Sequence, residues 1–470
     1  MNKISFSAFW FSLWAVASAV AQQPCGTQLP EHMKEWLRTH AAQNQMPLPA
    51  EVRTVYELPM HIHLVGRDNG TGLHYLDVLW QNLCDLNDQF AETGFMFYLK
   101  NYPTYIFNSA YYEHDYYTGA EMMFDYNVSN TINVYVVGDP AGNCGYFWGW
   151  PDAVAIARGC FNVGNTTFAH ELGHYFSLPH PFDNINGILE YVDGSNCTVG
   201  GDLFCDTRAD ILNYRWDCPY TGGAVDPKGM PYNPDSSLYM SYALDRCTYR
   251  FSPQQQNAMI NYLNAKRSYL KNQPKPDMGP ISGTVALQHP VEGDDQVPND
   301  FVEFRWSEVP GATFYHLQAT HFGNFYVPDM LNVLVEGTSF TTWLKPNKNF
   351  YWRVKPLNKG YFCAPYSATG TFRTVQGTGM QQAASTGISV FPTLVSSGQQ
   401  VYVSGVSGTG NDRSLRWEIF AAEGKWMASG ALEAGTGQTG SFSLPALPSG
   451  CYLLRLSNNE QHATLKLIVR

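Results

Sequence analysis

The eleven residues HELGHYFSLPH, from His170 to His180, constrain this chain more than any other stretch. They hold three of its 13 histidines together with Glu171. On a helix, His170 and His174 are four residues apart, so both rings lie on one face about one turn from each other. His180 follows too late to join them while the helix continues, and so the chain must leave the helix near Ser177 and fold back.

This spacing is typical of a metal site. Three neutral imidazoles leave the fourth position of a tetrahedral zinc ion open, as in catalytic rather than structural zinc sites. Glu171 lies beside the ligands, where its carboxylate could take a proton from water. The alternative is a helix whose histidines are only hydrogen-bonded.

Length and charge limit the remaining possibilities. A chain of 470 residues with 44% hydrophobic residues predicts several packed domains. The 29 basic and 40 acidic residues give a formal charge of -11, and no basic run could neutralise a phosphate backbone. We therefore expect no nucleic-acid partner.

The first 21 residues have the pattern of a signal peptide. Lys3 gives a positive start, an apolar run follows, and Ala19-Val20-Ala21 forms a cleavage site of small residues. Later stretches are too short and too polar for a membrane span, so we expect no transmembrane segment in the mature chain. The protein is predicted to be secreted.

Export places the ten cysteines in an oxidising compartment, where disulfides persist. Cys144 and Cys160 flank a short hairpin-like segment and could form one bridge. Four more cysteines crowd the region after the histidines and allow three pairings, which sequence does not separate: Cys197, Cys205, Cys218 and Cys247.

Composition and periodicity divide the chain. We expect a multidomain protein with a mixed α/β (α+β) domain followed by two all-β sandwiches. The predicted segments are a signal peptide (1–21), a pro-segment (22–52), the α/β domain (53–271), a proline-rich linker (272–289), a first β-sandwich (290–375), a second linker (376–386) and a last β-rich domain (387–470).

The motifs of the α/β domain resemble a known family. HExxHxxxxxH is similar to the zinc signature of the metzincin metallopeptidases. GSNC, GDLFCDT and LYMSYALDRCTYRFSPQQ are similar, in order and spacing, to the pappalysin family. The resemblance covers about residues 53–271.

The resemblance implies a role for each motif residue. Glu171 would be the general base and acid. Met240 would form the Met-turn, an apolar floor beneath the metal, and Tyr242 would donate its hydroxyl to the oxyanion. The zinc ligands would be His170, His174 and His180.

Ser177 departs from the commonest form of the signature, which has glycine at that turn. Glycine readily adopts a positive φ, whereas serine carries a modest strain there. The departure concerns the geometry of the turn and not the identity of the ligands.

Three further expectations rest on the same resemblance. Relatives use a cysteine in a CGT-like leader as a latency switch at the open zinc position, and Cys25 would take that role. The alternative is an ordinary disulfide, for example with Cys84.

Asp245 would lie in the pocket that receives the residue after the scissile bond and would favour a basic residue there, which would make Val52-Arg53 an autolytic site. The alternative is a surface aspartate. Asp202 and Asp206 would offer oxygen ligands to Ca²⁺, unless they belong to a solvated loop.

The two C-terminal segments also resemble known modules. FRWSEVPGATFYHLQ and FYWRVKP are similar to a fibronectin type III domain, a fold that by itself assigns no function. VFPTL, EIFAAEGKWM, LPALPSGCYLLRL and TLKLIVR resemble the C-terminal sorting domain of the type IX secretion system of Bacteroidetes. That resemblance implies export by type IX machinery to the outer-membrane surface or exterior of a Gram-negative bacterium.

The sequence as a whole predicts a secreted, zinc-dependent endopeptidase made as a latent precursor. Its substrates would be proteins or peptides, bound extended along an edge strand near GYFW. The rival hypothesis is a secreted adhesin or binding protein, whose zincin-like domain binds metal without useful turnover.

Overall fold

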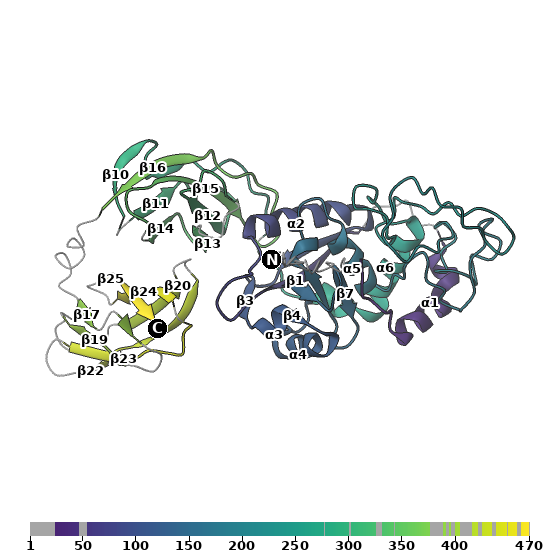
Figure 1. Cartoon of the computed structure of the whole chain (residues 1–470), viewed down its shortest axis with the longest axis horizontal. Helices are drawn as coiled ribbons and strands as arrows, with labels where there is room; N and C mark the ends of the chain where they lie inside the picture. Colours follow the sequence, from purple (N-terminus) through teal and green to yellow (C-terminus); the bar gives the residue numbers. More distant parts are fainter. Residues whose placement is uncertain are drawn as a thin grey trace, which may run out of the picture.

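The computed structural model describes residues 24–46, 54–276, 278–299, 302–325, 331–342 and 344–376. Beyond these it describes residues 389–391, 394–395, 400–404, 416–421, 425–434, 439–448, 450–457 and 462–469. The predicted signal peptide, Arg53 and most of the second linker lie outside these ranges. Figure 1 shows three units, of which the first carries the helices.

The first unit is built on one mixed sheet. The strand order is β2 (Phe95–Leu99), β1 (Tyr56–Gly66), β5 (Ile132–Val137), β8 (Ala153–Ala157) and β7 (Gly145–Trp148), and β3 (Thr104–Phe107) also pairs with β1. All of these pairs are parallel except β7 with β8, so β7 is an antiparallel edge strand.

Helices cover both faces of this sheet. On β1, Met60, Ile62 and Leu64 share one core with residues of α2 (Leu76–Gln89), α5 (Thr167–Tyr175) and α6 (Pro253–Lys266). The other face packs against α3 (Ser109–Tyr112) and α4 (Tyr116–Tyr126). Short elements complete the unit: η1 (Ala91–Thr93), β4 (Glu113–His114), β6 (Asp139–Pro140), η2 (Arg158–Cys160) and η3 (Ser268–Asn272).

The chain between α5 and α6 contains no regular helix or strand. Isolated bridges join Trp216 to Ala243 and Leu238 to Arg250. Of the three pairings left open by the sequence, the structure has Cys197–Cys205 and Cys218–Cys247, and the expected Cys144–Cys160 bridge is also present. Such cross-links restrict a loop that has little secondary structure of its own.

The predicted pro-segment (residues 22–52), called the leader from here on, contains a helix that is buried against the first unit. Its helix α1 (Glu31–Asn44) buries Met33, Trp36 and Leu37 in the main core of the first unit. The Trp36 ring meets Tyr262 of α6 edge-on, with ring centroids 5.0 Å apart. The leader is therefore a part of the folded domain and not a loose extension.

The second unit is a two-sheet sandwich. One sheet has the order β10 (Asp294–Pro298), β16 (Gly370–Val375), β15 (Asn349–Leu357), β12 (Phe314–Thr320) and β13 (Leu331–Val335). The other contains β14 (Ser339–Thr342), β11 (Val302–Trp306) and β9 (Leu287–His289). Ile281 and Val285 already belong to this core, so the predicted linker is too long at its C-terminal end.

The third unit also contains two sheets around its own core. One sheet has β17 (Ser389–Phe391), β19 (Gln400–Ser404), β23 (Thr439–Ser443) and β22 (Glu433–Ala434) in that order. The other has β18 (Leu394–Val395), β25 (His462–Val469), β24 (Gly450–Ser457), β20 (Arg416–Ala421) and β21 (Trp426–Ala431). No helix among the described residues is both long and apolar enough to cross a membrane.

The second unit is fastened to α2 of the first. A disulfide joins Cys84 of α2 to Cys363, which corrects the alternative pairing of Cys84 with Cys25. Beside it, the Trp80 ring stacks on Phe362, and its indole N–H donates to His316 at 3.2 Å. Figure 1 shows α2 at this junction.

We predict that replacing Cys84 and Cys363 together with alanine weakens this junction. The bridge spans 279 residues, so its loss should lower the free energy of unfolding by about 2 to 4 kcal/mol. Urea denaturation measures the loss, and limited proteolysis between the units reports their separation. The matched control is Cys197→Ala with Cys205→Ala, because that bridge spans only 8 residues and joins no units. Unchanged unfolding and proteolysis in the first variant would contradict the prediction.

Candidate metal centre

The helix α5 carries the first two histidines and ends just after them. Its last residue is Tyr175, and Ser177 then adopts a φ of 81°. This left-handed residue reverses the chain, so that the Leu178 N–H donates back to the Gly173 carbonyl at 2.9 Å. The reversal returns His180 to the helix, as the sequence predicts.

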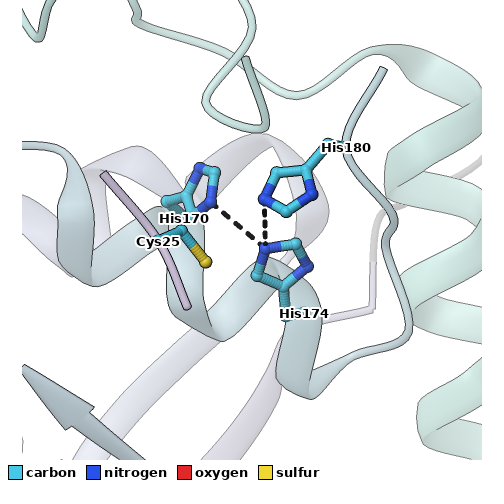
Figure 2. Close-up of side chains that lie close together, drawn as sticks. All are labelled: Cys25, His170, His174 and His180. Atoms are coloured by element: carbon cyan, nitrogen blue, oxygen red, sulfur yellow. Dashed lines mark hydrogen bonds between the residues drawn. The ribbon is translucent and has the colours of Figure 1, made fainter. Parts of the chain in front are cut away.

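The three imidazoles point at one another. The Nε2 atom of His174 lies 3.1 Å from Nε2 of His170 and 3.1 Å from Nε2 of His180. Figure 2 shows this convergence, with the Cys25 side chain beside the three rings. One atom from each histidine and the sulfur all lie within 4.8 Å of one another.

Each imidazole is oriented by its outer nitrogen. The Nδ1 atom of His170 lies 2.7 Å from the Tyr239 carbonyl, and that of His174 lies 2.7 Å from the Leu178 carbonyl. The Nδ1 atom of His180 lies 3.0 Å from the Asp183 carboxylate. Because carbonyl oxygens only accept, the proton of His170 and of His174 must sit on Nδ1, and the Asp183 carboxylate favours the same tautomer in His180.

The inner nitrogens therefore carry lone pairs that face each other inside the protein. The exposed fractions are 6% for His170, 1% for His174 and 3% for His180. Burial lowers the pKa of His170 to about 3 and lowers that of His174 as well, so their rings stay neutral. Three converging imidazole nitrogens and a sulfur are a donor set that fits zinc.

Glu171 lies directly beside this centre and is fully buried. Burial raises its pKa to about 8, and one carboxylate oxygen accepts a hydrogen bond from the Thr27 hydroxyl at 2.9 Å. Gly145 of β7 makes room for it, because a Cβ there would lie 2.8 Å from the Glu171 side chain. Thr27 is a contact that the sequence interpretation missed.

The leader occupies the cleft over the metal ligands. Cys25 is the free cysteine of the described residues, and burial together with the Glu171 charge raises the pKa of its thiol. The hydroxyl of Tyr242 donates to the Cys25 carbonyl at 3.2 Å. Tyr242 thus faces the peptide that crosses the site.

Met240, predicted to form the apolar floor of the site, packs against the helix α5 at Gly173. Its side chain is fully buried, and a Cβ on Gly173 would come within 2.3 Å of its sulfur. The helix can therefore approach Met240 only with glycine at this position.

Asp245 lies beside the centre, and its carboxylate accepts four hydrogen bonds within the protein. One oxygen accepts from the Thr166 N–H at 3.1 Å and the Thr166 hydroxyl at 2.9 Å. The other accepts from Asn165 at 3.0 Å and Arg215 at 2.9 Å. Nothing in the local sequence pattern indicated Arg215 as the partner.

The two aspartates considered as calcium ligands have different surroundings. Asp206 accepts hydrogen bonds from the Ser252 hydroxyl and the Gln254 N–H at the start of α6, so its carboxylate is bound to the N-terminus of that helix. Asp202 is fully buried near Glu190, whose Oε2 atom has no hydrogen-bond partner among the described residues. Burial, followed by the charge of Glu190, raises the pKa of Asp202.

The chain is similar to several extracellular metalloproteases. It is 25% identical over 286 residues to one from Colletotrichum graminicola, a match that covers 54% of this chain and 94% of the relative. It is 26% identical over 282 residues to one from Arthroderma gypseum, covering 53% and 87% of the two chains. No family model matches. These relatives support a metalloprotease.

One solved structure has limited similarity to the chain. A promirolysin mutant from Tannerella forsythia overlays with a TM-score of 0.40 at 18% identity, covering 53% of this chain and 97% of that one.

We predict that Ser177→Gly stabilises the protein by about 0.5 to 1 kcal/mol. Serine is strained at a positive φ, and the buried Ser177 hydroxyl has no hydrogen-bond partner among the described residues. Urea denaturation checks the gain. Ser177→Ala is the matched control, since it removes the hydroxyl but keeps the strained Cβ. If the glycine variant is no more stable than the alanine variant, the strain argument is wrong.

Proposed function

We propose that this chain is a secreted zinc endopeptidase made as a latent precursor. The observation that carries the proposal is the convergence of three Nε2 atoms beside the buried carboxylate of Glu171. The similarity to extracellular metalloproteases supports the secreted metalloprotease part of this proposal.

The ligands would be His170, His174 and His180. A zinc ion held by them would act as a Lewis acid that polarises the carbonyl of the scissile bond and lowers the pKa of water. Glu171 would take the proton from the attacking water and pass it to the leaving amine, and burial raises its affinity for that proton.

Tyr242 would stabilise the oxygen that becomes negative during attack. Its hydroxyl already donates to a peptide carbonyl in this cleft, that of Cys25. A donor preorganised for a carbonyl at this place is suited to the oxyanion that forms from it.

Latency would come from the leader. Its Cys25 sulfur lies within 4.8 Å of the converging histidine nitrogens, where it would take the fourth position of a metal ion, and the Thr27 hydroxyl donates to the carboxylate of Glu171. The leader also covers the edge strand β7, because the Gly26 N–H donates to the Gly145 carbonyl at 2.8 Å. A substrate could use this edge only after the leader has left.

Two finer assignments complete the proposal. A Ca²⁺ ion near Asp202 and Glu190 would lie beside two buried carboxylates whose pKa values are raised by burial and on which no cation among the described residues acts. The third unit would act as a type IX sorting domain and the second as a fibronectin type III-like spacer, on the sequence resemblance alone. A preference for a basic residue after the cut would rest on the carboxylate of Asp245, which pairs with Arg215 in this structure.

We predict that Glu171→Ala lowers proteolysis at least about a hundredfold while zinc stays bound, because the carboxylate moves a proton and holds no metal. Cleavage of unfolded casein measures activity, and elemental analysis measures zinc. His174→Ala should lose both zinc and activity, whereas Glu121→Ala on the exposed face of α4 should change neither. Equal cleavage by Glu171→Ala and the parent would favour the binding-protein hypothesis.

We also predict an effect of Cys25→Ala on self-cutting of the leader, which would occur at the expected Val52-Arg53 bond. The variant should shorten the lag, that is, the time before the leader is cut off. If the contact contributes about 1.4 kcal/mol, its loss makes the form with an open site about tenfold more populated. Because cutting would need that open form, the lag should shorten by up to about tenfold. The N-terminal mass over time measures it. The double variant Cys25→Ala with Glu171→Ala is the control and should keep its leader. An unchanged lag would leave Cys25 without a role in latency.

A further inference from the structure

The edge strand β7, which the leader covers, is fixed at both of its ends. Just before its start, Cys144 is bonded to Cys160, and the Cys144 carbonyl accepts from the Ala157 N–H at 2.8 Å. Beyond its end, the chain turns back into β8 at Asp152, whose N–H donates to the Trp148 carbonyl at 2.9 Å. Among the described residues, β7 pairs with one strand, β8, so its outer edge is left for a peptide such as the leader.

Arg267 fixes the turn at the far end of β7. It directly follows α6 and is 6% exposed. Its two terminal nitrogens donate to the two carboxylate oxygens of Asp152 at 2.6 and 2.7 Å, which makes a bidentate pair. Asp152 has a φ of 72°, a left-handed conformation that residues other than glycine seldom adopt. The ion pair therefore stabilises a turn whose backbone is itself strained.

The same guanidinium also binds the helix that carries the metal ligands. Its Nε–H donates to the carbonyl of Tyr175, the last residue of α5, at 2.9 Å. The guanidinium carbon lies 3.5 Å from the centroid of the Tyr175 ring. The Phe147 ring of β7 meets that tyrosine ring edge-on, with centroids 5.7 Å apart. One buried arginine thus joins the end of α5 to the end of the edge strand.

This junction lies at the end of the path that the leader follows along β7. Beside the metal centre, the Gly26 N–H donates to the Gly145 carbonyl. Further along, Pro30 lies against Gly149, where a Cβ would come within 2.4 Å of the proline ring. The edge therefore extends from the metal centre to the turn that Arg267 holds. A shift of that turn relative to α5 would move a bound peptide relative to the three histidines.

We propose that Arg267 is a positioning residue that fixes β7 relative to α5, so that an extended substrate lies in register with the metal centre. The inference rests on the proposed function and adds a residue to it. Arg267 would act through Asp152 and Tyr175 rather than by touching the substrate. Contacts far from the cut bond speed a reaction only when they hold that bond in place.

The test uses the full chain, loaded with zinc, after limited proteolysis has removed its leader. A short peptide around the cut bond is compared, by kcat and KM, with peptides extended by about four residues on either side. In the parent, extension along the edge should raise kcat/KM about tenfold, since each added backbone hydrogen bond contributes modestly. In Arg267→Lys this gain should fall to about twofold, because an ammonium lacks the planar fork of the guanidinium. The rate for the short peptide should stay nearly unchanged.

The matched control is Arg353→Lys in the second unit. Arg353 is also largely buried, lies 3.7 Å from the Asp77 carboxylate and stacks on the Tyr366 ring at 4.0 Å. Its partners are in α2 and the second unit, so the gain from extension should equal that of the parent. Asp152→Asn is a milder second variant, because the Asp152 side chain is 34% exposed and water can reach it. Its gain should lie between those of the parent and Arg267→Lys.

A second readout needs no turnover. In the intact precursor, the Gly26 N–H is bonded to the Gly145 carbonyl, and the Phe147 N–H donates to the Thr27 hydroxyl at 2.8 Å. If Arg267 fixes the edge, the segments that contain these N–H groups should exchange hydrogen about tenfold faster in Arg267→Lys, because exchange reports local opening. Arg353→Lys should exchange there as the parent does.

The outcomes separate the two proposals. If the short and the extended peptides lose activity by the same factor, or if exchange at β7 is unchanged, the positioning role of Arg267 is wrong and the protease stays in place. If the parent cleaves no peptide although zinc is bound, the proposed function fails, and the substrate register fails with it. Exchange at β7 then still decides whether Arg267 fixes the edge strand.

Discussion

The structure of the centre depends on the hydrogen bonds that hold the outer nitrogens of the three imidazoles. Tyr239, Leu178 and Asp183 supply the acceptors, and they come from three different turns of the chain. Only with these bonds in place do the inner nitrogens present lone pairs to one point. The region after α5 must therefore be folded before the centre exists, which explains why a segment without regular structure carries two disulfides.

Much of the centre could be predicted because its signal is local. Helical periodicity places His170 and His174 on one face, and the separation of His180 requires a reversal near Ser177. The observed φ of Ser177 is the value that such a reversal needs. The mixed α/β fold of the first unit could also be predicted from its alternation of strands and helices.

The remainder depends on partners that are distant in sequence. No spacing rule pairs Cys84 with Cys363, since the bond follows from how two domains dock. Arg215 pairs with Asp245 across 30 residues of irregular chain. The sequence therefore could not show that the Asp245 carboxylate has an arginine partner. The burial of Trp36 could not be predicted either, because the sequence of α1 is largely polar and its contact with Tyr262 of α6 is distant along the chain.

The burial of α1 changes what a cut between the leader and the first strand can achieve. While the chain is intact, the leader is held at a high effective concentration by its covalent connection. After a cut it becomes a separate ligand, still held by the core contacts of Met33, Trp36 and Leu37 and by the Asn257 bonds to the Gln43 and Asn44 carbonyls. Its departure then follows mass action. On the proposed function, a processed sample would stay inhibited when concentrated and become active on dilution, so activity per molecule would depend on how much enzyme is present.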